Sequence, residues 1–159
     1  MRIGLVSDTH DRLPTLHAAL ERFAQLGVET LIHPGDVIAP FAAKVLAGFP
    51  GKLYIIYGNN DGERAGLQEV LPQIQQGPLW LDLAGKRILL HHFVEWCRAE
   101  DLARADIIVS GHTHRPAIEP RDGKLFVNPG ECCGWVTGRA TVAIIDLKTS
   151  AAELIEVPT

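Results

Sequence analysis

The sequence predicts an α/β fold in which two β-sheets pack face to face and helices cover their outer faces. In the first third of the chain, short apolar runs alternate with amphipathic segments, which is typical of successive β-α units. The remainder is mostly short strands separated by turn residues, which indicates further β structure. Two packed sheets with outer helices accommodate both halves of this pattern.

Length and composition favour one globular domain spanning residues 1–159, with 47% hydrophobic residues and a mean hydropathy of +0.09. No apolar run approaches the roughly 20 residues of a membrane span, and no signal peptide is recognisable, so we expect no membrane association. A net charge of −4 disfavours stable nucleic-acid binding. The chain has only three cysteines, two of them adjacent, which fits a reducing compartment and predicts a cytoplasmic protein.

The first half of the chain reads as alternating strands and helices. Ile3, Leu5 and Val6 form an apolar run typical of a buried parallel strand. We expect Asp11 to cap the helix that follows, which contains Pro14 in its first turn and ends at Leu26. The other expected elements here are strands at 29–32 and 53–57, a helix from Pro40 to about residue 47, and a short helix at 62–71.

The second half changes to short strands. Residues 80–83 and 87–90 read as a hairpin around Ala84 and Gly85. A short helix at 98–104 and a buried strand at 106–109 follow, and then come paired strands at 117–120 with 124–127 and at 141–147 with 152–157.

Metal-binding residue types follow five of the predicted strands. They are Asp8 and His10, Asp36, Asn59, His91, and the pair His112 and His114. Because the carboxyl ends of parallel strands form the ligand-binding edge of a sheet, we expect these side chains to converge. Asp, His and one amide suit two divalent cations, and the absence of cysteine disfavours a structural zinc site.

These blocks resemble the calcineurin-like metallophosphoesterases, specifically their small, uncapped bacterial and archaeal phosphodiesterases. The resemblance lies in SDTH, HPGD, GNND, HH and GHTH between residues 7 and 114, and in NPG at 128–130. It implies a four-layer α/β/β/α sandwich of two mixed sheets with a dinuclear metal centre at one edge. It also implies that Asp8, His10, Asp36 and His114 bind one metal, and Asp36, Asn59, His91 and His112 the other. Mn²⁺ is the expected ion, with Fe²⁺, Co²⁺, Ni²⁺ or Zn²⁺ as alternatives.

The activity implied by the resemblance is hydrolysis of a small phosphate ester, most simply a phosphodiester, by in-line attack of a hydroxide that bridges the two metals. A nucleotide is one candidate substrate, and a homo-oligomer that completes the open site is one candidate assembly. The alternatives are a non-enzymatic, Vps29-like protein-binding scaffold and a nucleotide pyrophosphohydrolase or nuclease. We expect Asn59 to contribute to catalysis, and Asp61 to orient a histidine or the Gly58 loop from behind the metal ligands.

Three positions depart from the family pattern. Asn60 stands where many members carry a histidine that protonates the leaving group, and an amide cannot do so. His92 replaces a glycine; it is a candidate acid, although the alternation of side chains along a strand favours a ring that faces away from the metals. Glu131 replaces a serine, where its charge either repels substrate or is lost to solvent.

The aromatic residues and cysteines near the predicted site are also explained by packing alone. Phe93, Trp96 and Trp135 would line an aryl or base pocket, but packing in the core or at a subunit interface is the favoured role for each. Cys132 and Cys133 are expected to be inert packing residues.

Overall fold

The computed structural model describes residues 1–159, and its first sheet contains both ends of the chain. Its strands are β1 (Arg2–Leu5), β2 (Thr30–His33), β3 (Lys52–Ile55), β9 (Ala140–Asp146) and β10 (Ala151–Val157). They are ordered β10-β9-β1-β2-β3. The first three strands pair in parallel, whereas β9 pairs antiparallel with both β1 and β10. The carboxyl ends of β1, β2 and β3 therefore lie along the same edge.

The second sheet is formed by the middle of the chain. Its strands are β4 (Leu79–Leu83), β5 (Lys86–Leu90), β6 (Ile107–Val109), β7 (Ala117–Arg121) and β8 (Lys124–Asn128). They are ordered β4-β5-β6-β8-β7, and β5, β6 and β8 are parallel to one another. Three more parallel carboxyl ends are thus available beside those of the first sheet.

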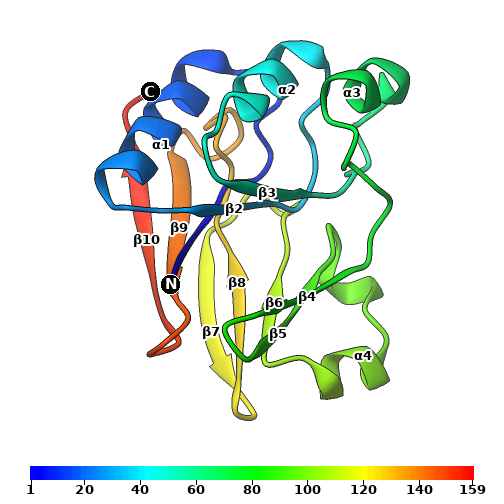
Figure 1. Cartoon of the computed structure of the whole chain (residues 1–159), viewed down its shortest axis with the longest axis vertical. Coiled ribbons are helices and arrows are strands. Elements are labelled where there is room, and N and C mark those ends of the chain that lie inside the picture. The colour runs from blue at the N-terminus through cyan, green and yellow to red at the C-terminus, as the bar shows by residue number, and fades with distance from the viewer.

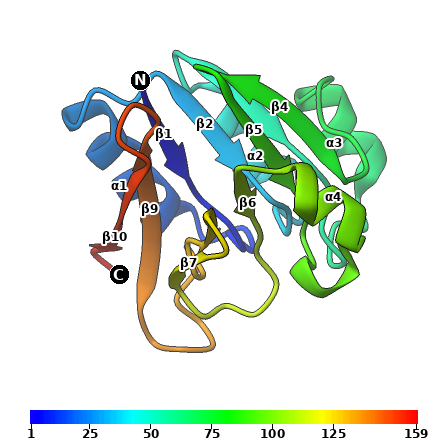
Figure 2. The ribbon, with the colours of Figure 1, turned by 90° about the horizontal axis from the view of Figure 1, so that it is seen from below.

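The two sheets pack face to face and carry helices outside, as the sequence predicts. Apolar side chains of β1, such as Ile3 and Leu5, share one buried cluster with those of β5, such as Ile88 and Leu90. The other face of the first sheet is covered by α1 (Leu13–Gln25), α2 (Pro40–Ala47) and α3 (Arg64–Val70), which lie along the top of Figure 1. The short helix α4 (Ala99–Arg104) covers the second sheet and faces the viewer in Figure 2. This is the expected four-layer sandwich.

Most expected elements are present within a residue or two, but the capping role of Asp11 was assigned to the wrong helix. No side chain caps α1, which begins after Arg12. Instead, Oδ1 of Asp11 accepts hydrogen bonds of 3.3 Å from the backbone N–H groups of Ala39 and Ala42, at the start of α2. The carboxylate reaches α2 because the loop after β1 runs beside the loop after β2, and backbone N–H groups of Thr9 and Asp11 donate to the carbonyls of Asp36 and Val37. No helix of the molecule combines the length and apolarity that a membrane crossing requires.

Candidate metal centre

The parallel strands of both sheets end at one edge of the sandwich, and six of the seven expected metal-binding side chains meet there. The loops after β1, β2 and β3 carry Asp8 with His10, Asp36 and Asn59, and the loop after β6 carries His112 and His114. The seventh expected residue, His91, does not join them, and its ring lines two neighbouring cavities instead. The centre is therefore built from both sheets.

Four side chains form the first group. One ligand atom from each of Asp8, His10, Asp36 and His114 lies within 4.8 Å of the others. Nε2 of His10 is 3.5 Å from Oδ2 of Asp36, and Nε2 of His114 is 3.5 Å from Oδ1 of Asp8. These separations are too long for direct hydrogen bonds and suit atoms arranged around a common centre.

Two buried polar atoms of this group lack any hydrogen-bond partner, namely Oδ1 of Asp8 and Nε2 of His10. Burial raises the pKa of the Asp8 carboxyl above its ordinary value, opposed by the Ser7 hydroxyl that donates to Oδ2 over 2.5 Å. Unpartnered buried polar atoms are costly. A divalent cation between these atoms would satisfy both of them, so the residues present fit a metal.

A second group continues from Asp36 to Asn59, His92 and His112. Oδ1 of Asn59 lies 2.9 Å from Nε2 of His92 and 3.0 Å from Nδ1 of His112. Nδ1 of His92 donates to the carbonyl oxygen of Pro34 over 2.8 Å, since a carbonyl can only accept. In the neutral ring, the lone pair of Nε2 then faces the oxygens of Asn59 and Asp36. Such converging lone pairs also suit a cation.

The structure reverses the orientations expected for His91 and His92. Ile88 and Leu90 of β5 point into the core between the sheets, whereas Leu89 packs on the outer side near α4. His91 continues the outer row and lines a cavity with Leu89 and Trp96. His92 continues the inner row and is buried beside Asp36, with its Nε2 3.6 Å from Oδ2. The expectation that His92 faces away was wrong because the parity of the strand was assigned one residue out of register.

Much of the site has a backbone conformation that is rare outside glycine. Of the ten non-glycine residues with positive φ, five carry candidate metal-binding side chains. Their φ values are 50° for Asp8, 42° for His10, 62° for Asp36, 66° for His112 and 61° for His114. Each costs roughly 1–3 kcal/mol in isolation. The surrounding contacts therefore have to impose these conformations.

Asp36 is held by the loop that follows β3. The backbone N–H of Asn60 donates to Oδ1 of Asp36 over 2.9 Å, and its side-chain amide donates to Oδ2 over 2.8 Å. Burial alone would raise the pKa of Asp36, but the side chains of His92 and Asn60 outweigh it and hold the pKa well below its ordinary value. Asp36 is accordingly a carboxylate. Because His92 faces it, the pKa of the His92 imidazole is raised despite burial.

Asp61 holds the same loops from behind, as the sequence suggested. Its carboxylate accepts three backbone hydrogen bonds of 2.7–2.9 Å, from Asp36, Ile38 and Gly58. Only 2% of its surface is exposed. Gly58 itself has to be glycine, since a Cβ there would collide with the carboxylate of Asp36. Asp61 therefore fixes the relative positions of the loops after β2 and β3.

A buried histidine outside the expected set links the loops after β1 and β2. Nδ1 of His33 accepts from the N–H of Gly35 over 3.1 Å, so its Nε2–H faces Oγ1 of Thr9 at 3.3 Å. The Thr9 hydroxyl donates in turn to the carbonyl of Asp36. Burial lowers the pKa of His33 to about 3, so the ring is neutral. This chain of bonds ties Thr9, the neighbour of Asp8, to the backbone of Asp36.

Glu131 contacts the first group in a way that the sequence did not predict. It is neither solvent-exposed nor directed at substrate, because its side chain is fully buried. Oε2 accepts from Nδ1 of His114 over 2.8 Å, and Oε1 accepts from the N–H of Thr137 over 2.5 Å. Burial raises the pKa of Glu131, but the bonds from His114 and Thr137 outweigh it and lower the pKa to about 2. The adjacent NPG motif was the available signal, since it places residue 131 shortly after β8, beside the site.

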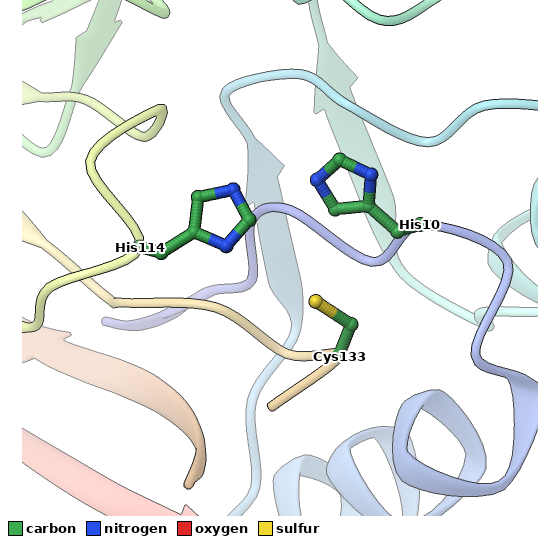
Figure 3. Close-up of side chains that lie close together, drawn as sticks. All are labelled: His10, His114 and Cys133. Carbon is green, nitrogen blue, oxygen red and sulfur yellow. The ribbon is translucent and has the colours of Figure 1, made fainter. Parts of the chain in front are cut away.

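Cys133 also lies at the centre, although packing was its expected role. Its Sγ belongs to a compact group with nitrogens of His10 and His114, and Figure 3 shows the thiol directed toward both rings. Burial and the neighbouring Glu131 raise the pKa of this thiol to about 12. The thiol donates to Oε2 of Glu131 over 3.1 Å. It is therefore a protonated neighbour of the first group. Cys132 is fully buried, as expected.

The whole chain resembles known phosphodiesterases. The sequence profile of the calcineurin-like phosphoesterase superfamily domain matches residues 1–150. The phosphodiesterase MJ0936 of Methanocaldococcus jannaschii is 38% identical over 154 residues, which cover 92% of this chain and 93% of that protein. The solved structure of an archaeal phosphodiesterase superimposes with a TM-score of 0.86 at 32% identity, covering 99% of this chain and all of the other.

A likeness to a trafficking protein extends only to the fold. Vacuolar protein sorting 29 from Cryptosporidium parvum superimposes with a TM-score of 0.67 at 18% identity, covering 98% of this chain and 95% of the other. The sandwich is thus shared by proteins whose sequences differ widely.

Proposed function

The chain belongs to the calcineurin-like phosphoesterase superfamily, and from that premise we propose that it is a dinuclear metal-dependent phosphodiesterase. The observation that carries this proposal is the convergence of two carboxylates, four imidazoles and one amide at the common edge of two sheets. Within it, Oδ1 of Asp8 and Nε2 of His10 are buried without protein partners. The fold alone does not carry the activity, because one fold can host many unrelated functions.

We propose two metal-binding sets that share one carboxylate. Asp8, His10, Asp36 and His114 would bind one cation, and Asp36, Asn59, His92 and His112 the other. This assignment places His92 rather than His91 among the ligands. Mn²⁺ is the first ion to test, because mixed carboxylate, amide and imidazole donors accept it as well as Fe²⁺, Co²⁺, Ni²⁺ and Zn²⁺.

When bound, two such cations supply a water of lowered pKa and neutralise charge on a phosphoryl group undergoing in-line displacement. The protein's own part is to position them. Asp61 and Asn60 fix Asp36, and Glu131 holds the Nδ1 proton of His114 so that Nε2 faces the centre. Asn59 offers its amide oxygen between His92 and His112 and reaches the surface, where it can meet substrate.

The side chain of Asn60 limits the substrates. Its amide is committed to Asp36 and has no proton to release at neutral pH. The leaving group must then depart as an anion, which favours esters of acidic alcohols such as aryl esters. His92 cannot replace the missing acid while its Nδ1 proton is bonded to Pro34 and its Nε2 serves the second cation. We therefore propose no general acid.

The test is turnover of matched esters after metal exchange. Protein stripped of metal and reloaded with Mn²⁺ should hydrolyse bis(4-nitrophenyl) phosphate faster than 4-nitrophenyl phosphate, and stripped protein should hydrolyse neither. Asp36→Asn and His112→Ala should each lose most of this turnover. Protein containing about two metals per chain that turned over no ester would instead support a scaffold role. Strongly salt-dependent DNA binding would support a nuclease.

We also propose a cytoplasmic location. The observation that supports it is that Cys97, Cys132 and Cys133 are all unpaired.

A further inference from the structure

A cavity of about 350 Å³ opens directly beside the proposed metal ligands. Asn59 and His92 belong both to its wall and to the second metal-binding group. The rest of the wall comes from the residues that follow β3, from Arg64 at the start of α3, from Gln76 and Gly77, and from the segment after β5. A phosphoryl group held at the metals would therefore direct one of its ester substituents into this cavity.

One side of the cavity is a pair of stacked aromatic rings. The rings of Phe93 and Trp96 lie 4.1 Å apart at 18°, and the Phe93 ring is 4.2 Å from that of His112. Trp96 is 66% exposed, so it is not the core residue that its type suggested. A large exposed ring beside a cavity offers a planar apolar surface for a flat ligand.

Another part of the cavity wall is polar and carries positive charge. The guanidinium of Arg64 lies 4.5 Å above the ring of Tyr57, and its Nη1 donates to Oε1 of Gln76 over 3.2 Å. Nε of Arg64 donates to the backbone carbonyl of Asp61 over 3.0 Å. These three contacts fix the guanidinium, yet its Nη2 and the amide nitrogen of Gln76 remain available as donors. No carboxylate lines the cavity.

We infer that this cavity binds a planar heteroaromatic ring carried by the phosphodiester substrate, such as the base of a nucleotide. This inference rests on the proposed function, because the phosphate is taken to sit at the metals. Trp96, which is stacked on Phe93, supplies a face for the ring, while Arg64 and Gln76 donate to acceptors at its edge. A purely alkyl diester has neither a flat ring to stack on Trp96 nor ring acceptors for Arg64 and Gln76.

Direct binding tests the inference without any turnover. Mn²⁺-loaded protein should bind adenosine 5′-monophosphate at least about tenfold more tightly than ribose 5-phosphate, the advantage expected of one stacked base. Trp96→Ala should remove most of that advantage and leave the affinity for ribose 5-phosphate unchanged. Trp135→Ala is the matched control, because Trp135 is 61% exposed and adjoins His10 but lies outside the cavity.

The outcomes separate this inference from the proposed function. Equal affinities for the two ligands, or an equal loss in the Trp96→Ala and Trp135→Ala proteins, would overturn the cavity assignment even if phosphodiesters are hydrolysed. Trp96-dependent binding of the nucleotide without hydrolysis of any ester would overturn the proposed function alone. A change in molecular mass on sedimentation of Trp96→Ala would assign the ring to a subunit interface and also overturn the inference.

Discussion

Nδ1 of His114 donates its proton to the buried carboxylate of Glu131 over 2.8 Å, which leaves Nε2 aimed at Asp8. Because the proton is fixed on Nδ1, the nitrogen facing the centre is the one that can bind a cation. We expect Glu131→Gln to weaken Mn²⁺ binding at this group by about 10–100-fold. Calorimetric titration of the stripped protein measures it, with the exposed Glu153→Gln as control. Unchanged affinity alongside lowered thermal stability would mean that Glu131 only anchors its loop.

Alanine substitutions of the two neighbouring histidines after β5 should differ in their effect on metal content. His92→Ala removes a ring buried against Asp36 and Asn59, and we expect the bound metal to fall from two ions per chain to about one. His91→Ala changes a ring on the outer row, so two ions should remain. Metal analysis after dialysis distinguishes them. Loss of an ion in the His91 variant instead would restore the ligand set expected from the sequence.

Asp61 is expected to contribute chiefly to stability. In Asp61→Asn, one carboxylate oxygen that accepts a backbone N–H is replaced by a donor, which leaves at least one buried N–H without its partner. We expect the free energy of unfolding of the metal-free protein to fall by about 2 kcal/mol. Urea denaturation measures it against Asp82→Asn, whose side chain is exposed on β4. A fall in the free energy of unfolding of less than about 0.5 kcal/mol would mean that Asp61 does not hold the loops after β2 and β3 in place.

Introducing an acid at position 60 should broaden the range of leaving groups. Asn60→His places a titratable group beside Asp36, and we expect hydrolysis of an alkyl leaving group to gain about 100-fold relative to an aryl one. Rates for diesters with leaving groups of graded pKa measure this change as a shallower dependence on leaving-group pKa. Asn60→Ala, which loses the same contact to Asp36, should show no such gain. Equal dependence in wild type and Asn60→His would mean that another group already donates the proton.

The pKa of the Cys132 thiol predicts a loss of stability at alkaline pH. Burial raises this pKa from 9.0 to about 12, so the native state retains a proton that the unfolded state has lost. The unfolded state then binds fewer protons, and stability falls as pH rises between about 9 and 12. Below pH 9 this contribution is complete and constant. Unfolding of wild type and Cys132→Ala across that range should show their difference shrinking with pH, whereas a constant difference would contradict the shift.

The sequence was sufficient for the layers and for the edge at which the site lies. Apolar runs such as that of Ile3, Leu5 and Val6, followed at once by Asp8, predict buried parallel strands whose polar ends converge. What it could not supply was the direction of single side chains at strand ends. His91 and His92 are adjacent residues of the same type, so the sequence does not show which ring enters the site. The ring that does so is the one on the same face of the strand as Leu90, which points into the core between the sheets.

The remaining differences come from contacts between segments distant along the chain. Asp11 caps α2 rather than α1 because the loops after β1 and β2 run side by side, and Glu131 reaches His114 because β8 ends beside β6. Trp96 and Trp135 are exposed although large aromatics are usually packed. Their positions depend on the paths of loops with no periodic pattern, which propensities do not determine.

The backbone N–H of His112 donates to Oδ2 of Asp8 over 3.2 Å, although the two residues are 104 positions apart. A cation shared by Asp8 and His114 would act there as a reversible cross-link between the sheets. Because these side chains meet only in the folded chain, the cation binds the folded state alone, and the free energy of unfolding rises with the logarithm of the free metal concentration relative to its dissociation constant. Metal supply would thereby govern how long the protein survives proteolysis as well as whether it is active.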